Sequence, residues 1–322
     1  MIRASLLCVT VLITLAVAPA EAAFPGEPGP IAYSKTSTDE TGEGTLERLG
    51  GLFAGRPRRP HRPHRLTLSP DDHSPSYSAD GRSIVFAGEG AGGRDSIFVM
   101  GSDGSERREV TVDGLGGADP HFFPNGRAIA FARTVEGHSH IFTVRLDGSG
   151  LRRLTSGAYD DSDPAVSPNG KRIVFISDRD QDSRRDRTDL FAVGAQGGGL
   201  RLLSDLPRSQ AEPDWSPDGK KIAFAMSAGA RSNIFVVRTG GSRLRQLTGC
   251  RNPPRCRSYV SPAFSPNGRQ VAAVGLGTRT STISLIRSDG RGVTTTVDSG
   301  SVEEEGFGSH VGAPAWAPRL AR

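Results

Sequence analysis

Residues 163–175 read Asp-Pro-Ala-Val-Ser-Pro-Asn-Gly-Lys-Arg-Ile-Val-Phe, and the chain repeats this pattern several times. A short run follows Pro164, and a Pro-Asn-Gly turn is followed by an alternating apolar run. Two such runs around a tight turn predict a β-hairpin. The turn glycine is preceded by Asp or Asn and followed by Arg or Lys in five copies, at Gly81, Gly126, Gly170, Gly219 and Gly268. The spacings of 45, 44, 49 and 49 residues identify the stretch as the first half of a repeat.

The second half of the repeat adds another apolar pair, another turn and an ending that resembles Leu-Thr. In the third copy these are Leu190-Phe191, Gly197-Gly198 and Leu203-Ser204. Four predicted strands in a period of about 45 to 50 residues are typical of a propeller blade rather than a helical solenoid. One blade cannot bury both of its faces, so we expect blades stacked around an axis, with the ring closed to remove exposed edges.

The two ends of the chain each contain part of one blade. Residues 31–34 match the second strand of a blade and Leu66-Thr67 match a blade ending, but no first strand precedes them. Residues 313–318 repeat a blade opening. Five continuous blades are predicted to open at Pro75, Pro120, Pro164, Pro213 and Pro262. We therefore predict an all-β fold: a six-bladed propeller of four-stranded blades, with a sixth blade split between about residues 30–68 and 313–318 and closed by pairing of the terminal strands.

The first 22 residues have the pattern of a secretory signal. Arg3 supplies a positive charge, an apolar run follows from Leu6 to Val17, and small residues follow the run. The run is shorter than the ~20 residues that a membrane span needs, although an uncleaved anchor is an alternative. We expect an exported protein, periplasmic or extracellular, in which residues 23–322 form a single propeller domain.

Composition agrees with an exported all-β chain, because 41 glycines and 22 prolines provide many turns. After removal of the signal only Cys250 and Cys256 remain, both in one short loop. In an oxidising compartment we expect them to form a local disulfide rather than two free thiols. Two cysteines are too few for a metal site, and no cofactor is expected.

The predicted strand order separates two kinds of connection. With the first strand innermost, the tight turns lie on one face, and the variable connections lie on the opposite face, where recognition usually occurs. The connections that lead into the first strands are acidic. They supply a candidate channel-mouth binding site formed by Asp119, Asp163, Glu212 and His121. We expect a basic rim outside it, with candidate residues Arg58, Arg59, Arg62, Arg184 and Arg185.

Each of these features has a simpler explanation. An Asp before a proline often caps a turn or bonds a nearby backbone group. Residues 56–65, an Arg-Pro-His tract, are expected to form a flexible solvated connection, with polyanion binding as the alternative. The histidines lack a complete set of partners at metal-ligand spacing. A bound cation at the channel mouth is the one ion we keep as an option.

Several motifs resemble those of the TolB-type six-bladed propeller repeat. They are Pro-Asp-Trp-Ser-Pro-Asp-Gly-Lys-Lys-Ile-Ala-Phe at residues 213–224, Ser-Asp-Arg-Asp at 177–180 and Asp-Gly-Ser-Gly-Leu-Arg-Arg-Leu-Thr at 147–155. The resemblance covers nearly all of residues 23–322. It implies the fold but little about function, since this family includes periplasmic partner-binding proteins and propellers fused to serine peptidases. The chain lacks the separate amino-terminal α/β domain of the TolB protein, so a role in that envelope complex is not implied.

The sequence provides little evidence for catalysis. It has no Gly-x-Ser-x-Gly motif, no phosphate loop and no zinc-protease helix motif. We expect a monomeric, non-enzymatic propeller that binds a protein, a peptide or a cell-envelope polymer, with no specific nucleic-acid partner. The alternative is a glycan lyase or hydrolase at the channel mouth, for which His121 would be the residue to examine.

Overall fold

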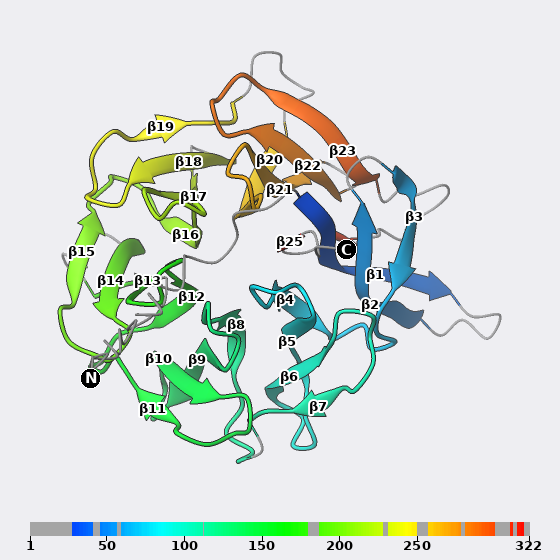
Figure 1. Cartoon of the computed structure of the whole chain (residues 1–322), viewed down its shortest axis with the longest axis horizontal. Helices are drawn as coiled ribbons and strands as arrows, with labels where there is room; N and C mark the ends of the chain where they lie inside the picture. Colours follow the sequence, from blue (N-terminus) through cyan, green and yellow to red (C-terminus); the bar gives the residue numbers. More distant parts are fainter. Residues whose placement is uncertain are drawn as a thin grey trace, which may run out of the picture.

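The structure is a computed structural model in which the blades surround a central axis (Figure 1). It describes residues 28–40, 46–56, 59–111, 113–179, 187–227, 231–249, 257–277, 281–299, 310–311 and 314–318. The predicted secretory signal and the predicted disulfide between Cys250 and Cys256 lie outside these residues. The described part contains no helix long and apolar enough to cross a membrane.

Five blades are four-stranded antiparallel sheets built from consecutive strands. The first two blades are β4 (His73–Tyr77), β5 (Ser83–Glu89), β6 (Asp95–Gly101) and β7 (Arg108–Glu109), then β8 (Ala118–Phe122), β9 (Ala128–Val135), β10 (His138–Arg145) and β11 (Arg152–Arg153). The third and fourth are β12 (Asp161–Val166), β13 (Arg172–Ser177), β14 (Asp189–Gly194) and β15 (Arg201–Ser204), then β16 (Gln210–Trp215), β17 (Lys221–Ser227), β18 (Ser232–Arg238) and β19 (Arg245–Gln246). The fifth is β20 (Ser258–Phe264), β21 (Gln270–Leu276), β22 (Ser281–Arg287) and β23 (Val293–Ser299).

The sixth blade joins the two ends of the chain, as the sequence predicted. It consists of β1 (Pro28–Glu40), β2 (Leu46–Arg56), β3 (Arg59–Arg65), β24 (His310–Val311) and β25 (Ala315–Pro318). Strand β25 pairs antiparallel with β1, where Ile31 lies opposite Trp316. Strand β24 pairs farther along the same strand, where Thr36 lies opposite His310. Together they take the place of the first strand that the amino-terminal segment lacks.

The repeated Pro-Asn-Gly turn has the same geometry in each continuous blade. In the third blade the Gly170 N–H donates to the Ser167 carbonyl at 2.8 Å, and Asn169 Oδ1 accepts the N–H of Lys171 at 3.0 Å. Gly170 has a φ of 67°, a left-handed conformation that glycine adopts without the steric penalty of a Cβ atom. The other four turn glycines have φ values between 65° and 68°. This shared geometry explains why the glycine spacing reveals the repeat.

The hydrophobic cores lie between neighbouring blades. Strands two and three of most blades contribute a pair of aromatic rings, such as Phe175 and Phe191, whose centroids are 6.0 Å apart. The same packing closes the ring, because Ile31 and Trp316 of the sixth blade pack with residues of the fifth. On the other side Ala317 packs with Phe86 of the first blade. Every blade therefore buries its faces against two neighbours.

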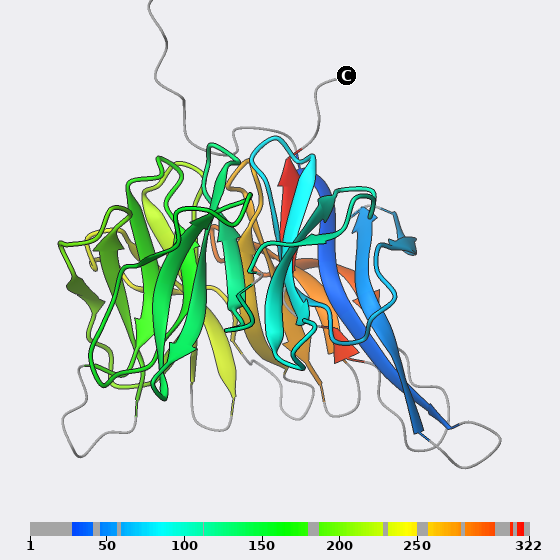
Figure 2. The same cartoon turned by 90° about the horizontal axis from the view of Figure 1, so that it is seen from below.

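The innermost strands run from one face of the ring to the other. Turns between strands one and two and between strands three and four lie on one face, which we call the tight-turn face. The remaining connections lie on the opposite face, which we call the mouth face. Figure 2 shows the long β1–β2 ribbon extending past the ring on this side. Each first strand starts at the mouth face, so residues at its beginning surround the axis there.

One part of the predicted organisation is wrong. Residues 59–65 of the Arg-Pro-His tract form β3, the outermost strand of the sixth blade, instead of a flexible connection between strands two and three. An outermost strand tolerates proline, because one of its edges needs no hydrogen-bond donors. Arg59 therefore begins a fourth strand, next to the tight-turn face, and the basic rim stays a prediction. The side chains of Arg59 and Arg62, and the whole of Arg58, Arg184 and Arg185, lie outside the described part.

Closure by β25 predicts a large effect of removing it. Deleting residues 313–322 should uncover the edge of β1 and lower the melting temperature by at least about 6 °C. Loss of a buried tryptophan costs about 3–5 kcal/mol, and each kcal/mol shifts the midpoint by about 2–4 °C in a domain of this size. Thermal unfolding followed by circular dichroism measures the change, with deletion of residues 319–322 alone as the control. An unchanged midpoint in the longer deletion would contradict closure by β25.

Candidate functional site

A bulge at the start of the first strand orients the site residues in five blades. The strand-one register shifts around each x-Pro pair, for example between Ser162 and Ala165. The residue before the proline takes a left-handed conformation in all five, with φ of 49° at Ser74, 50° at Asp119, 52° at Asp163, 52° at Glu212 and 51° at Ser261. Non-glycine residues rarely adopt this region. Bulges re-aim side chains, and here all five of these residues line one axial pocket.

Hydrogen bonds link these pre-proline residues from one blade to the next. Asp119 accepts hydrogen bonds from the Ser74 hydroxyl at 3.3 Å and from the backbone of Asp163. Asp163 Oδ2 accepts the N–H of Glu212 at 3.4 Å. Glu212 in turn accepts the Ser261 N–H at 2.6 Å and the Ser261 hydroxyl at 2.8 Å. These side chains therefore tie successive blades together.

The residue after each proline makes a second set of links between blades. Three of these side chains face a backbone N–H of the following blade: Phe122 N–H to Ser76 Oγ at 3.5 Å, Val166 N–H to His121 Nδ1 at 3.4 Å, and Phe264 N–H to Asp214 Oδ2 at 2.6 Å. His121 Nδ1 lies closer, at 3.0 Å, to the Phe122 carbonyl. That shorter contact favours a proton on Nδ1, and in this tautomer Nδ1 cannot also accept the Val166 N–H. The other ring nitrogen, Nε2, lies 4.0 Å from Asp214 Oδ1.

Tryptophan supplies the link where the residue after the proline is alanine. Trp215 Nε1 donates to the Ala165 carbonyl at 3.1 Å, and Trp316 Nε1 donates to the Ala263 carbonyl at 3.0 Å. Both indoles are buried. Tyr77 occupies the equivalent position in the first blade, and its buried hydroxyl has no hydrogen-bond partner among the described residues.

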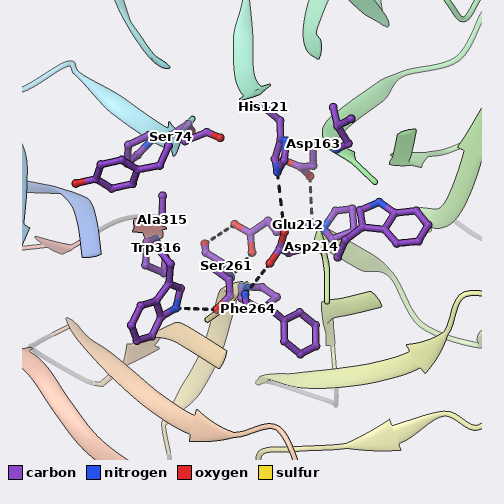
Figure 3. A pocket seen from close by; sticks show the side chains of 18 of the residues that line it. Ser74, His121, Asp163, Glu212, Asp214, Ser261, Phe264, Ala315 and Trp316 are labelled. Carbon is purple, nitrogen blue, oxygen red and sulfur yellow. Dashed lines mark hydrogen bonds and ion pairs between the residues drawn. The ribbon is translucent and has the colours of Figure 1, made fainter. Parts of the chain in front are cut away.

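The axial pocket has a volume of about 200 Å³ and gathers the predicted channel-mouth residues. Figure 3 shows three of them, His121, Asp163 and Glu212. Asp119, Asp163, Glu212 and His121 all line it. The structure adds Asp214, which is not among the predicted site residues. Asp214 immediately follows Pro213, the position that His121 holds in its own blade, and this correspondence was visible in the sequence. Much of the remaining wall is proline, and no lysine or arginine is among the described residues that line the pocket.

Burial makes these carboxylates hard to ionise. It raises the pKa of Asp163 to about 7, with Asp119 and Glu212 as further causes. Burial also raises the pKa of Asp214 to about 7 and shifts the pKa values of Asp119 and Glu212 upward. The pKa of the His121 imidazole is lowered by burial. The pocket therefore holds less negative charge at neutral pH than its composition suggests, and a cation would favour ionisation.

The carboxylates are not arranged as a metal site. Among the described residues, no group of three or more His, Cys, Asp and Glu side chains is placed to hold a metal ion. The acidic side chains lie on consecutive blades, each held by its own bonds to the next blade. This arrangement suits a larger cationic group that contacts several carboxylates in turn. The cation option at the mouth stays a prediction.

Comparison with known proteins confirms the resemblance of the repeats. Residues 59–198 match the family model described as the TolB beta propeller domain. Together with the six blades of the structure, this match shows a TolB-like six-bladed propeller fold. A search of curated proteins finds no match to the sequence.

Solved structures share this architecture at low sequence identity. TolB from Acinetobacter baumannii aligns with a TM-score of 0.70 and 23% identity over 92% of this chain and 68% of that protein. A putative TolB from Agrobacterium tumefaciens aligns with a TM-score of 0.66 and 19% identity over 90% of this chain and all of that one. An oligogalacturonate lyase from Vibrio parahaemolyticus aligns with a TM-score of 0.51 and 14% identity over 84% of this chain and 73% of that protein. These identities establish the fold alone.

The links between blades predict opposite effects for two conservative substitutions. Trp215→Phe removes the indole donor to Ala165 and leaves a small void, so it should lower the free energy of unfolding by about 1–3 kcal/mol. Tyr77→Phe removes a buried hydroxyl that lacks a partner and should raise stability by up to about 1 kcal/mol. Urea denaturation measures both. Equal effects of the two changes would mean that the indole bond does not stabilise the ring.

The raised pKa of Asp214 predicts that stability depends on pH. Because its pKa is about 7 in the folded chain and 3.8 ordinarily, the folded protein binds the extra proton between these values. Its contribution is therefore fully present below about pH 4 and is lost as the pH rises through about 7. Asp214→Asn should flatten this part of the stability profile, as measured by urea denaturation at several pH values. An identical slope in the variant would show that Asp214 ionises normally.

Proposed function

We propose that this chain is an exported, non-enzymatic binding propeller that recognises a protein or peptide partner, or an envelope polymer, through its mouth face. The axial pocket takes a cationic group of that partner. The observation that carries the proposal is the set of carboxylates Asp119, Asp163 and Glu212, which line one pocket together with Asp214 and without a lysine or arginine. The TolB-type architecture supports a binding scaffold.

Electrostatics favours a basic occupant. A carboxylate whose pKa is raised by burial and by its neighbours gains most when a positive charge arrives, because the charge offsets both causes. Low-dielectric walls strengthen the attraction by focusing the field. Binding of a cation therefore releases protons from residues such as Asp163, and affinity should increase as the pH rises toward 8. A lysine or arginine side chain, or a free amino terminus, supplies the required charge.

The alternative is a glycan lyase or hydrolase in the same pocket. One observation favours it, the closeness of His121 Nε2 to Asp214 Oδ1 at 4.0 Å. One protein of similar fold is an oligogalacturonate lyase, and oligogalacturonate is a polycarboxylate. An acidic mouth repels such a substrate unless a metal ion intervenes, and the described residues offer no metal cluster. Binding is the better-supported function.

A triple substitution separates charge from structure. Asp119→Asn, Asp163→Asn and Glu212→Gln together keep acceptors for the bonds between blades and remove the negative charge. We expect affinity for a partner recovered from native cell envelopes to fall about 3- to 150-fold at low salt, since three lost charge contacts at roughly 0.2–1 kcal/mol each total about 0.6–3 kcal/mol. The dependence of affinity on salt should also weaken, which titration calorimetry at two salt concentrations measures.

The matched control removes three carboxylates from the tight-turn face. Asp103→Asn, Asp147→Asn and Asp218→Asn make the same change in net charge and should leave affinity unchanged. If the mouth variant folds normally and binds with unaltered affinity and salt dependence, the axial pocket is not the binding site. If wild-type protein degrades oligogalacturonate and His121→Ala abolishes the activity, the lyase alternative replaces the proposal.

A further inference from the structure

A second cavity opens beside the axial pocket. It has a volume of about 590 Å³ and is lined mainly by the segments that join β5 to β6, β7 to β8 and β9 to β10. We call it the side groove. Its lining residues include Arg94, Asp95, Leu115, Asp119 and Glu136. Asp119 lines both cavities, so the side groove continues the axial pocket outward between blades.

The wall of the side groove is held in place by a buried arginine. Arg133 donates to both carboxylate oxygens of Asp113, at 2.7 Å and 3.0 Å, and to the Gly116 carbonyl at 2.8 Å. Its guanidinium also lies over the Phe131 ring, 5.1 Å from the centroid. These contacts fix the segment from Asp113 to Gly116 before any ligand arrives. A preorganised wall lowers the entropic cost of binding.

The side groove is acidic, and Leu115 is the largest apolar side chain among the described residues that line it. Three carboxylates line it, those of Asp95, Asp119 and Glu136, against the exposed guanidinium of Arg94. Arg133 adds no net charge because Asp113 neutralises it. Leu115 lies on this wall with 54% of its surface exposed. Charge complementarity therefore calls for a basic occupant that also carries an apolar side chain.

We propose that the side groove and the axial pocket form one continuous site for an extended basic peptide segment of a partner protein. The proposal rests on the proposed function of the axial pocket and adds a second part to it. One cationic side chain enters the axial pocket, the chain passes Asp119, and a second cationic side chain reaches Asp95 and Glu136. An apolar side chain between them packs on Leu115. Recognition then needs two charges and one apolar residue in an extended segment.

Two labelled peptides test this arrangement. The short probe is acetyl-Gly-Lys-Gly-amide, and the long probe is acetyl-Gly-Lys-Gly-Leu-Gly-Lys-Gly-amide, which at ~3.3 Å per residue extends well beyond a single pocket. Fluorescence anisotropy should give at least fivefold tighter binding for the long probe. Leu115→Ser and Glu136→Gln should each remove much of that advantage and leave the short probe unchanged. Both residues are exposed, so the variants should fold normally.

Matched controls lie near the tight-turn face. Leu151→Ser changes a leucine that is 43% exposed, and Glu106→Gln changes an exposed glutamate with the same left-handed backbone as Glu136. Neither should alter the binding of either probe. A long probe whose affinity is unaffected by the groove variants would overturn the proposal. If Asp163→Asn still weakens both probes in that case, the axial pocket survives as the binding site.

The remaining outcomes are also decisive. If neither probe binds the wild-type protein, both the side groove and the axial pocket fail as sites for basic peptides. If the groove variants weaken the long probe but Asp163→Asn changes neither probe, the side groove binds without the axial pocket and the two-part site is wrong. If sedimentation finds a dimer that Leu115→Ser dissociates, the occupant is a second copy of this chain, and a partner peptide is excluded.

Discussion

Hydrogen bonds between consecutive first strands connect the blades around the axis. A propeller blade pairs its strands internally, so packing between blades is mostly hydrophobic and has little direction. The links from Asp163 to Glu212 and from Trp215 to Ala165 add directional contacts at the narrowest part of the ring. The links made by the carboxylates depend on the left-handed residue before each proline, because this conformation turns its side chain toward the next blade.

The same requirement explains why the mouth can be acidic without destabilising the ring. A carboxylate is a good acceptor for backbone N–H groups, and Glu212 accepts both the N–H and the hydroxyl of Ser261. Burial opposes ionisation of Asp163, and so does repulsion from Asp119 and Glu212. The pKa of Asp163 is therefore raised. The structural bonds persist in either protonation state, because an acceptor oxygen remains. The negative charge at the mouth can therefore change with protonation while the hydrogen bonds between blades remain.

Repetition made the architecture predictable. The turn glycines require a left-handed backbone, so their positions had to recur, and the unmatched Ile31 and Trp316 could be assigned to one blade. Ring symmetry likewise placed Asp119, Asp163 and Glu212 together. What symmetry could not predict was the left-handed backbone before the prolines, because a residue in that position ordinarily avoids it. The tract at 59–65 was misassigned because its prolines suggested a connection, whereas an edge strand accommodates them.

Comparison of equivalent positions in the blades explains why the acidic residues lie on one side of the axis. Equivalent positions before the prolines hold serine at 74 and 261 and carboxylates at 119, 163 and 212, so the acidic residues occupy one arc of three consecutive blades. A ligand at the axis therefore meets charge on one side and hydroxyls on the other. The side groove opens from the end of the acidic arc at Asp119, and not from its middle. Because the backbone frame is the same in every blade, this direction depends only on which side chains occupy equivalent positions. Substitutions at those positions can change what the mouth binds while the ring that holds them stays the same.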